Sequence, residues 1–170
     1  MKISYGKKAP GEVNVIIEIP KDTNVKYEFD KESGMIAVDR FGMTTMNYPC
    51  NYGFVPGTLS GDGDPVDVLI LSEQSVMPGV ILAAKPIALL EMEDESGLDN
   101  KVVAVPAVTG DITYGNLSNL DDIPENIKNK IKHFFERYKD LDEGKWVRVK
   151  GWAEKDAAVK EIENGIKNAK

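Results

Sequence analysis

Short alternating runs of hydrophobic and polar residues dominate the first two thirds of the chain and predict β-strands. From Val13 to Ile19, Val15 and Ile17 share one face with Ile19, whereas Glu18 points to the other face. Glycine, proline, asparagine and aspartate separate such runs, which is typical of a twisted sheet or barrel. The other runs that predict strands are residues 26–30, 35–40, 66–71, 80–90 and 101–105.

The last third of the chain has helical periodicity. Apolar residues at positions 127, 131, 134, 135 and 138 fall on one helix face. Asp122 is the expected N-cap of this helix, and Pro124 lies near its first turn. Residues 145–150 alternate as a further strand, and a terminal helix begins near Lys155. The pattern predicts one α+β domain over residues 1–170, a curved or closed sheet with helices packed outside it.

Composition excludes several classes of protein. The chain of 170 residues is 42% hydrophobic and has one cysteine and one histidine. A single cysteine excludes an internal disulfide and suits a reducing cytosol, and one Cys with one His cannot form the usual zinc site. We find no apolar run long enough to span a membrane and read no signal peptide, so we expect a cytoplasmic protein.

Net charge narrows the choice of partners. The chain carries 28 acidic and 21 basic residues, for a net charge of −7. Affinity for nucleic acid rests mostly on phosphate neutralisation, so we expect no nucleic-acid partner. An anionic substrate would need a local basic patch or bound cations.

The sharpest motif is GDGDPVD at residues 61–67, where Asp62, Asp64 and Asp67 bring three carboxylates together. Their mutual repulsion favours protonation of some of them or capture of a cation. Oxygen ligands alone suit Mg²⁺ or Mn²⁺. Asp67 shares a strand face with two leucines, which places it at the rim of a core. The alternative is an acidic surface turn, because Asp-Gly turns are common.

The remaining charged residues say less when each is taken alone. The acidic residues 93–95 lie between two apolar runs, which by itself predicts a solvated hairpin loop. Basic residues are scattered at Lys26, Arg40, Lys101 and Lys139, and each taken alone favours a structural or solvated role over a functional one.

Taken together, the motifs resemble those of one enzyme family. GDGDPVDVLIL occurs in order with EIP at 18–20, KYEFDKESG at 26–34, VDRF at 38–41, YPCNYGF at 48–54 and HFFERYKDL at 133–141. The chain resembles a soluble family I inorganic pyrophosphatase of the prokaryotic type over residues 14–152, although residues 107–116 match no motif of that family. The resemblance implies a small closed five-stranded, OB-like β-barrel with flanking helices. It also implies Mg²⁺-dependent hydrolysis of pyrophosphate to two phosphates by a metal-activated hydroxide, without a covalent intermediate.

The resemblance assigns roles to fourteen residues, all of the expected type. Asp67 would bridge two metals and, with Asp64 as general base, would form the catalytic pair. The expected metal ligands are Glu18, Asp62, Asp67, Asp94 and Asp99. The expected substrate-binding residues are Lys26, Arg40, Tyr52, Lys101, Tyr138 and Lys139, and Glu28 and Tyr48 would support them.

Charge balance tests this assembly. Its seven carboxylates exceed its four cations by three charges, and fully ionised pyrophosphate adds roughly four more. Neutrality then needs about three to four divalent ions, in keeping with metal-assisted phosphoryl chemistry. Mg²⁺ is the expected ion, with Mn²⁺ or another divalent ion possible. The resemblance also implies a homo-oligomer, specifically a hexamer.

Two other functions remain open from the residues. One is hydrolysis of a nucleotide or polyphosphate, against which stands the lack of a Walker-type loop. The other is a non-catalytic divalent-cation module, which would need the acids but would have no use for cations converging on them. Wide separation of the four basic residues from Asp67 would favour the module.

Overall fold

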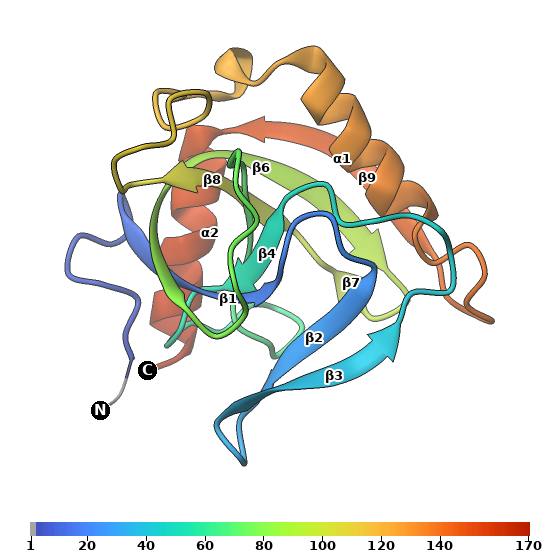
Figure 1. Ribbon diagram of the computed structural model, residues 1–170. Helices are drawn as coiled ribbons and strands as arrows, with labels where there is room; N and C mark the ends of the chain where they lie inside the picture. The colour runs from blue at the N-terminus through green and yellow to red at the C-terminus, as the bar shows by residue number, and fades with distance from the viewer. Residues whose placement is uncertain (1–2) are drawn as a thin grey trace.

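The computed structural model describes residues 3–170, which form two sheets and two α-helices (Figure 1). In chain order the elements are β1 (Val13–Ile19), β2 (Val25–Asp30), β3 (Met35–Phe41), β4 (Asn51–Phe54), β5 (Asp67–Ile70), β6 (Ile81–Asp94), β7 (Gly97–Leu98), β8 (Lys101–Pro106), the short 3₁₀-helix η1 (Leu120–Asp122), α1 (Glu125–Arg137), β9 (Val147–Glu154) and α2 (Lys155–Asn168).

Five strands close into a ring. They follow the order β1-β4-β5-β8-β6, and β6 pairs back onto β1, which confirms the predicted five-stranded barrel. Closure depends on β6, whose first half pairs with β1 and β8 and whose second half continues to β9 and β7. Its ladder with β8 is irregular between Pro86 and Ala88, as expected where proline cannot donate a ladder hydrogen bond.

Alternate strand residues supply two hydrophobic clusters, one for each face of the sheet. In β5, Leu69 belongs to the cluster that packs with α1, and Val68 belongs to the cluster that packs with α2. Phe134 and Phe135 are the large residues that α1 adds to the first cluster, and Ile162 of α2 belongs to the second. The two helices therefore hold opposite faces of one curved sheet.

The strands β2 and β3 form a separate hairpin that projects from the barrel at the lower right of Figure 1. Lys26 pairs with Arg40 and Tyr27 pairs with Val38, so Asp39 has no partner of its own. This β-bulge interrupts the alternation of side chains along β3.

The structure differs from the sequence-based expectations at several boundaries. β4 was not predicted, β6 runs to Asp94 rather than residue 90, and β9 covers 147–154 rather than 145–150. Gly53 interrupts the apolar pattern of β4 because a Cβ there would collide with the carbonyl of Ile16 on β1. Close approach of two strands, rather than β-propensity, selects this residue.

The predicted cap of α1 was wrong. Asp122 ends η1, and its carboxylate accepts the backbone N–H groups of Ser118 (2.7 Å) and Asn119 (3.0 Å). Pro124 precedes the first turn of α1 and makes no side-chain capping bond.

Candidate active site

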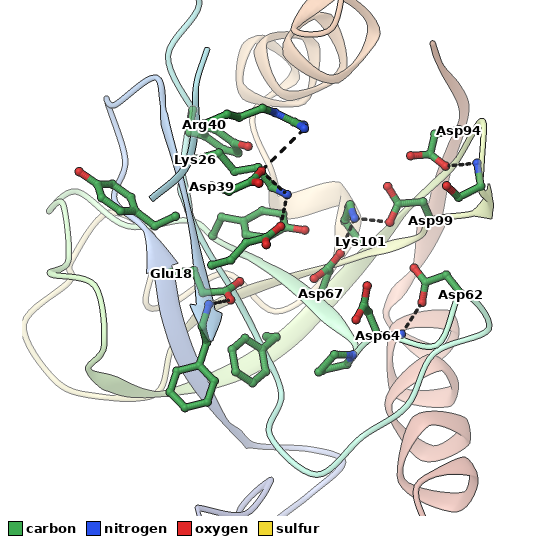
Figure 2. Close-up of a pocket in the computed structure, with 18 of the residues that line it drawn as sticks. Glu18, Lys26, Asp39, Arg40, Asp62, Asp64, Asp67, Asp94, Asp99 and Lys101 are labelled. Atoms are coloured by element: carbon green, nitrogen blue, oxygen red, sulfur yellow. Dashed lines mark hydrogen bonds and ion pairs between the residues drawn. The ribbon is translucent and has the colours of Figure 1, made fainter. Parts of the chain in front are cut away.

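All fourteen residues assigned by resemblance line one open cavity of about 890 Å³ (Figure 2). Strands from both sheets supply most of them, the loop before β5 supplies Asp62 and Asp64, and the residues after α1 supply Tyr138 and Lys139. Positions that are up to 121 residues apart in the sequence thus meet because the ring closes and the β2–β3 hairpin flanks its mouth.

Lys101 lies at the centre of the acidic group. Its ammonium forms ion pairs with both Asp67 and Asp99, and the residue is only 4% exposed. Burial opposes the charged form, but the two carboxylates outweigh it and raise the pKa of Lys101, so the side chain stays a cation. For Asp99 burial prevails over Lys101 and raises the carboxyl pKa.

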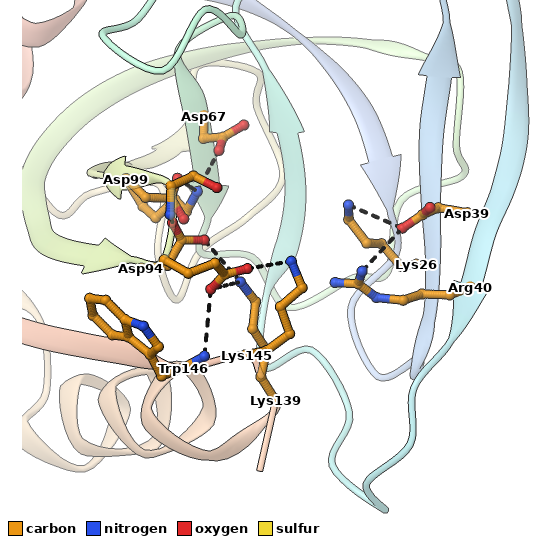
Figure 3. Close-up of polar contacts among 12 residues, drawn as sticks. Lys26, Asp39, Arg40, Asp67, Asp94, Asp99, Lys139, Lys145 and Trp146 are labelled. Carbon is orange, nitrogen blue, oxygen red and sulfur yellow. Dashed lines mark hydrogen bonds and ion pairs between the residues drawn. The ribbon is translucent and has the colours of Figure 1, made fainter. Parts of the chain in front are cut away.

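A second group of charges lies at the end of β6 (Figure 3). Lys139 Nζ lies 2.9 Å from Asp94 Oδ2 and 3.6 Å from Glu95 Oε2. Glu95 also pairs with Lys145 at 2.5 Å and accepts the N–H of Trp146 at 3.5 Å. Burial would raise the pKa of Glu95, but Lys145 and Lys139 lower it to about 2. The predicted hairpin is confirmed, since β6 pairs with β7 across a turn at residues 95–96. The prediction that its acids are solvated is wrong for Asp94 and Glu95, which are neutralised by cations.

The third group comes from the β2–β3 hairpin. Lys26 forms ion pairs with Glu28 and, at 3.2 Å, with Asp39, which also lies 3.7 Å from Arg40 Nη1. Because Asp39 is the bulged residue of β3, its carboxylate and the Arg40 guanidinium both reach the cavity. Strict alternation would have placed them on opposite faces.

Glu18 is the carboxyl of the site whose pKa is raised furthest. Its side chain points from β1 and accepts the N–H of Phe29 at 2.7 Å. Burial, reinforced by the charge of Asp67, raises its pKa to about 7. Such a group prefers a proton or a cation near neutral pH.

Three tyrosines form one wall of the site. Tyr48 is packed against Tyr52 and Tyr138, with ring centroids 5.9 and 6.4 Å apart. Burial raises the pKa of all three phenols, so they remain neutral O–H groups at physiological pH. The ammonium of Lys101 lies 5.5 Å from the centroid of Tyr52. The wall therefore combines hydrogen-bond donors with a fixed cation.

The donor chemistry of the site fits divalent cations. Asp67 and Asp99 already converge on one cation, the Lys101 ammonium, and the other acids supply oxygen ligands only, as Mg²⁺ prefers. Within residues 3–170, however, no three acidic, histidine or cysteine side chains lie close enough together to hold one ion. Lysines neutralise the acids in this arrangement, so a metal ion would have to compete with Lys101 and Lys139.

Sequence reasoning assigned no role to five charged residues of the cavity: Asp30, Lys31, Asp39, Glu95 and Lys145. Asp39 was present in the VDRF motif but was hidden by the assumption of regular alternation. Glu95 and Lys145 acquire their place only when the end of β6 meets the segment before β9. Their opposite charges gave no sign in the sequence that they are neighbours.

Comparison with known proteins identifies the family of this chain. The family model "Inorganic pyrophosphatase" matches residues 15–170. An inorganic pyrophosphatase of Rickettsia bellii is 57% identical over 156 residues, covering 91% of this chain and 89% of its own. One from Aeropyrum pernix is 54% identical over 170 residues, covering 100% and 97%. A solved inorganic pyrophosphatase from Coxiella burnetii is 51% identical, with a TM-score of 0.95 over 99% of this chain and 100% of its own. The chain therefore belongs to the family of inorganic pyrophosphatases, family I, and is an enzyme of that family.

Proposed function

We propose that this enzyme hydrolyses inorganic pyrophosphate to two phosphates with divalent metal ions, Mg²⁺ foremost. One observation carries the proposal: ten carboxylates and six cations line the same cavity, and each of the six cations forms an ion pair with one of these acids. Such a cavity suits a dense anion that arrives with divalent ions, since neither set of charges alone would hold both. With substrate present, about three to four ions balance the charge of the site.

The acidic residues divide into ligands and a base. Asp67, Asp99, Asp94, Asp62 and Glu18 would hold the ions, which supply Lewis-acid activation of water and charge neutralisation. Asp64 is the proposed general base and would take the proton of the attacking water. The water oxygen forms a bond to one phosphorus atom while the bridging P–O bond breaks, and the leaving phosphate keeps that electron pair. No enzyme–substrate bond is needed.

The basic and phenolic residues would bind phosphate oxygens. Lys26 and Arg40 lie on the hairpin side of the cavity, whereas Lys101 and Lys139 lie on the barrel side. Charge that develops on the phosphoryl oxygens is therefore met from both sides. Tyr52 and Tyr138 would add neutral O–H donors, and Glu28 and Tyr48 would hold Lys26 and the tyrosine wall in place.

The arrangement also weighs against a non-catalytic cation module. Lys26, Arg40, Lys101 and Lys139 all line the cavity that contains Asp67. A module that only stores a divalent cation gains nothing from four competing cations there. Their convergence supports binding of an anionic substrate.

Phosphate release from pyrophosphate, measured with Mg²⁺, tests this function. We expect rapid release that EDTA abolishes, and little release from ATP at the same concentration. Comparable release from ATP would indicate a broader phosphoanhydride hydrolase. No release from pyrophosphate at any Mg²⁺ or Mn²⁺ concentration would contradict the proposal.

We further propose that the protein is a homohexamer that acts in the cytoplasm. The hexamer is supported by the family resemblance, and the cytoplasm by the buried, unpaired Cys50. No helix in the described part of the chain is both long and apolar enough to cross a membrane. Light scattering should give the mass of six chains; a monomer mass at micromolar concentration would contradict the assembly.

A further inference from the structure

The loop that carries Asp62 and Asp64 is closed at its base by a threonine hydroxyl. Val55 follows β4 and Val66 precedes β5, and the N–H of Val55 donates to the carbonyl of Val66 at 2.9 Å. The reciprocal bond of an antiparallel pair is absent here. Instead, Thr58 Oγ1 accepts the N–H of Val66 at 2.9 Å and donates to the carbonyl of Val55 at 2.6 Å. A buried side chain thus replaces one backbone bond at the point where the two strands separate.

The same loop rests on the terminal helix. The N–H of Leu59 donates to the carbonyl of Gly165 on α2 at 2.9 Å, and Asn168 Nδ2 donates to the carbonyl of Leu59 at 3.3 Å. Gly165 permits this contact, because a Cβ there would lie 3.1 Å from Thr58 Cβ and would overlap Val66. Glycine costs helix propensity, so its presence in α2 has a packing reason.

Helix α2 also contacts the segment that carries Asp99. Glu161 Oε1 accepts from Ser60 Oγ at 3.4 Å, and Glu161 Oε2 accepts from Asn100 Nδ2 at 3.5 Å. Asn100 follows Asp99 directly, and its Oδ1 accepts the N–H of Met92 at 3.3 Å. One helix therefore contacts the loop that carries Asp62 and Asp64 as well as the residue next to Asp99.

We propose that Thr58 is a positioning residue, which together with its contact surface on α2 sets the place of the 61–67 loop and so the affinity of the site for divalent ions. The proposal rests on the proposed function only in taking this cavity as the site of divalent-ion binding. The predicted effect of Thr58 is on ion affinity and not on the hydrolysis step.

Asp62 and Asp64 are exposed, and the hydrogen bonds that residues 61–64 make within the described part of the chain, such as Asp64 N–H to Asp62 Oδ1 at 3.0 Å (Figure 2), join them only to one another and to Ser60. The contacts of Thr58 and α2 at the base of the loop therefore set where the tip lies relative to the barrel. Loss of the Thr58 hydroxyl leaves the buried N–H of Val66 without its partner, and the base of the loop must rearrange.

Binding of Mn²⁺ to the substrate-free protein, measured by electron paramagnetic resonance, tests the proposal. We expect Thr58→Val, which has nearly the same shape but no hydroxyl, to raise the Kd of Mn²⁺ about tenfold. Thr58→Ser keeps the hydroxyl and should stay within about twofold of the wild type. Amide exchange of residues 59–66 should be faster in Thr58→Val alone. Ile131→Val, on α1 away from the loop, serves as the control for a general loss of stability.

The outcomes separate the proposal from the proposed function. An unchanged Mn²⁺ Kd in folded Thr58→Val, or an equal loss in Thr58→Ser or Ile131→Val, would overturn the positioning role. If Thr58→Val does not fold, Asn168→Ala removes the exposed amide donor to Leu59, and an unchanged Mn²⁺ Kd there would overturn it as well. Failure of the proposed function would show differently, as an absence of phosphate release by the wild type while Mn²⁺ still binds.

Discussion

Asp67 shows how a single side chain serves both structure and the proposed chemistry. Its carboxylate lies at the edge of the core and is paired with the buried Lys101. Removal of both carboxylate partners would leave Lys101 as an unpaired buried cation, which strongly destabilises a fold. Asp99, however, can still pair with Lys101 when Asp67 is replaced. The residue is therefore more critical to the proposed ion binding than to the fold.

Replacing Asp67 by asparagine should separate the two roles. Asp67→Asn keeps the shape but removes the charge proposed to hold two ions, so we expect turnover to fall by roughly 10²-fold or more. Circular dichroism should remain that of the wild type. Near-normal turnover of a folded Asp67→Asn protein would remove Asp67 from the proposed metal bridge.

Glu18 gives a prediction for stability against pH. Burial raises its pKa from 4.5 in the unfolded chain to about 7 in the folded protein. Because the pKa is higher in the folded protein, the contribution of Glu18 to the free energy of unfolding is fully present below pH 4.5. That contribution is lost as the pH rises from 4.5 to about 7. In EDTA at pH 8, Glu18→Gln should therefore be more stable than the wild type, by about 2–4 kcal/mol at 1.4 kcal/mol per pKa unit.

Urea unfolding at several pH values measures this difference. The advantage of Glu18→Gln should shrink as the pH is lowered toward 4.5, where Glu18 is protonated in the folded protein. An advantage of the same size at pH 5 and pH 8 would mean that Glu18 does not titrate in this range.

At the scale of elements, the end of β6 joins the barrel to the segment that carries Lys139. Glu95 contacts Lys139, Lys145 and the backbone of Trp146 inside the cavity. Two residues earlier, Glu93 pairs with Arg148 (3.1 Å) and Lys150 (2.6 Å) on β9, away from the cavity lining. Glu93 therefore serves as a control for Glu95, because both residues pair with basic side chains but only Glu95 lines the cavity.

Neutralising each glutamate in turn tests what the contact does. Glu95→Gln should loosen Lys139 and raise the KM for pyrophosphate by about three- to tenfold, with a smaller change in kcat, because ground-state phosphate contacts weaken. Glu93→Gln should leave both constants within about twofold, since exposed ion pairs contribute little. Steady-state kinetics at saturating Mg²⁺ measures both. Equal effects of the two substitutions would refute a specific role for Glu95.

At the scale of the whole molecule, much of the excess of acidic over basic residues lies in the cavity. Ten of the acidic residues line the cavity against six basic ones. Repulsion among uncompensated carboxylates destabilises the folded state, and a bound divalent cation relieves it. The metal-free protein should therefore be less stable than the loaded one.

Thermal unfolding with and without Mg²⁺ checks this expectation. A ligand that binds only the folded state at 100 times its Kd adds about 2.7 kcal/mol, so millimolar MgCl₂ should raise the Tm by several degrees. KCl at equal ionic strength should not reproduce the rise. The absence of an Mg²⁺-specific shift, with EDTA-treated protein as the reference, would contradict ion binding at this site.

The sequence alone predicted most of the barrel strands and both helices, because their periodicity follows from which face is buried. β4 was not recognised from the sequence because it is short and contains Gly53. Glycine is needed at this position because β1 approaches its backbone closely. The N-terminus of α1 was mispredicted because the Asp122 carboxylate accepts the N–H groups of Ser118 and Asn119 instead of capping α1. Local pattern does not reveal such long-range or competing contacts.

The sequence by itself determined the fold class, the family and fourteen of the residues that line the cavity, because ordered motifs preserve residue identity at each position. Only the tertiary structure decided how these charges pair. Lys101 between Asp67 and Asp99, Glu95 on Lys139 and Lys145, and Thr58 beneath the acidic loop each join segments brought together by ring closure. Ion pairs and buried hydrogen bonds depend on distances of a few ångströms, which only the folded chain sets.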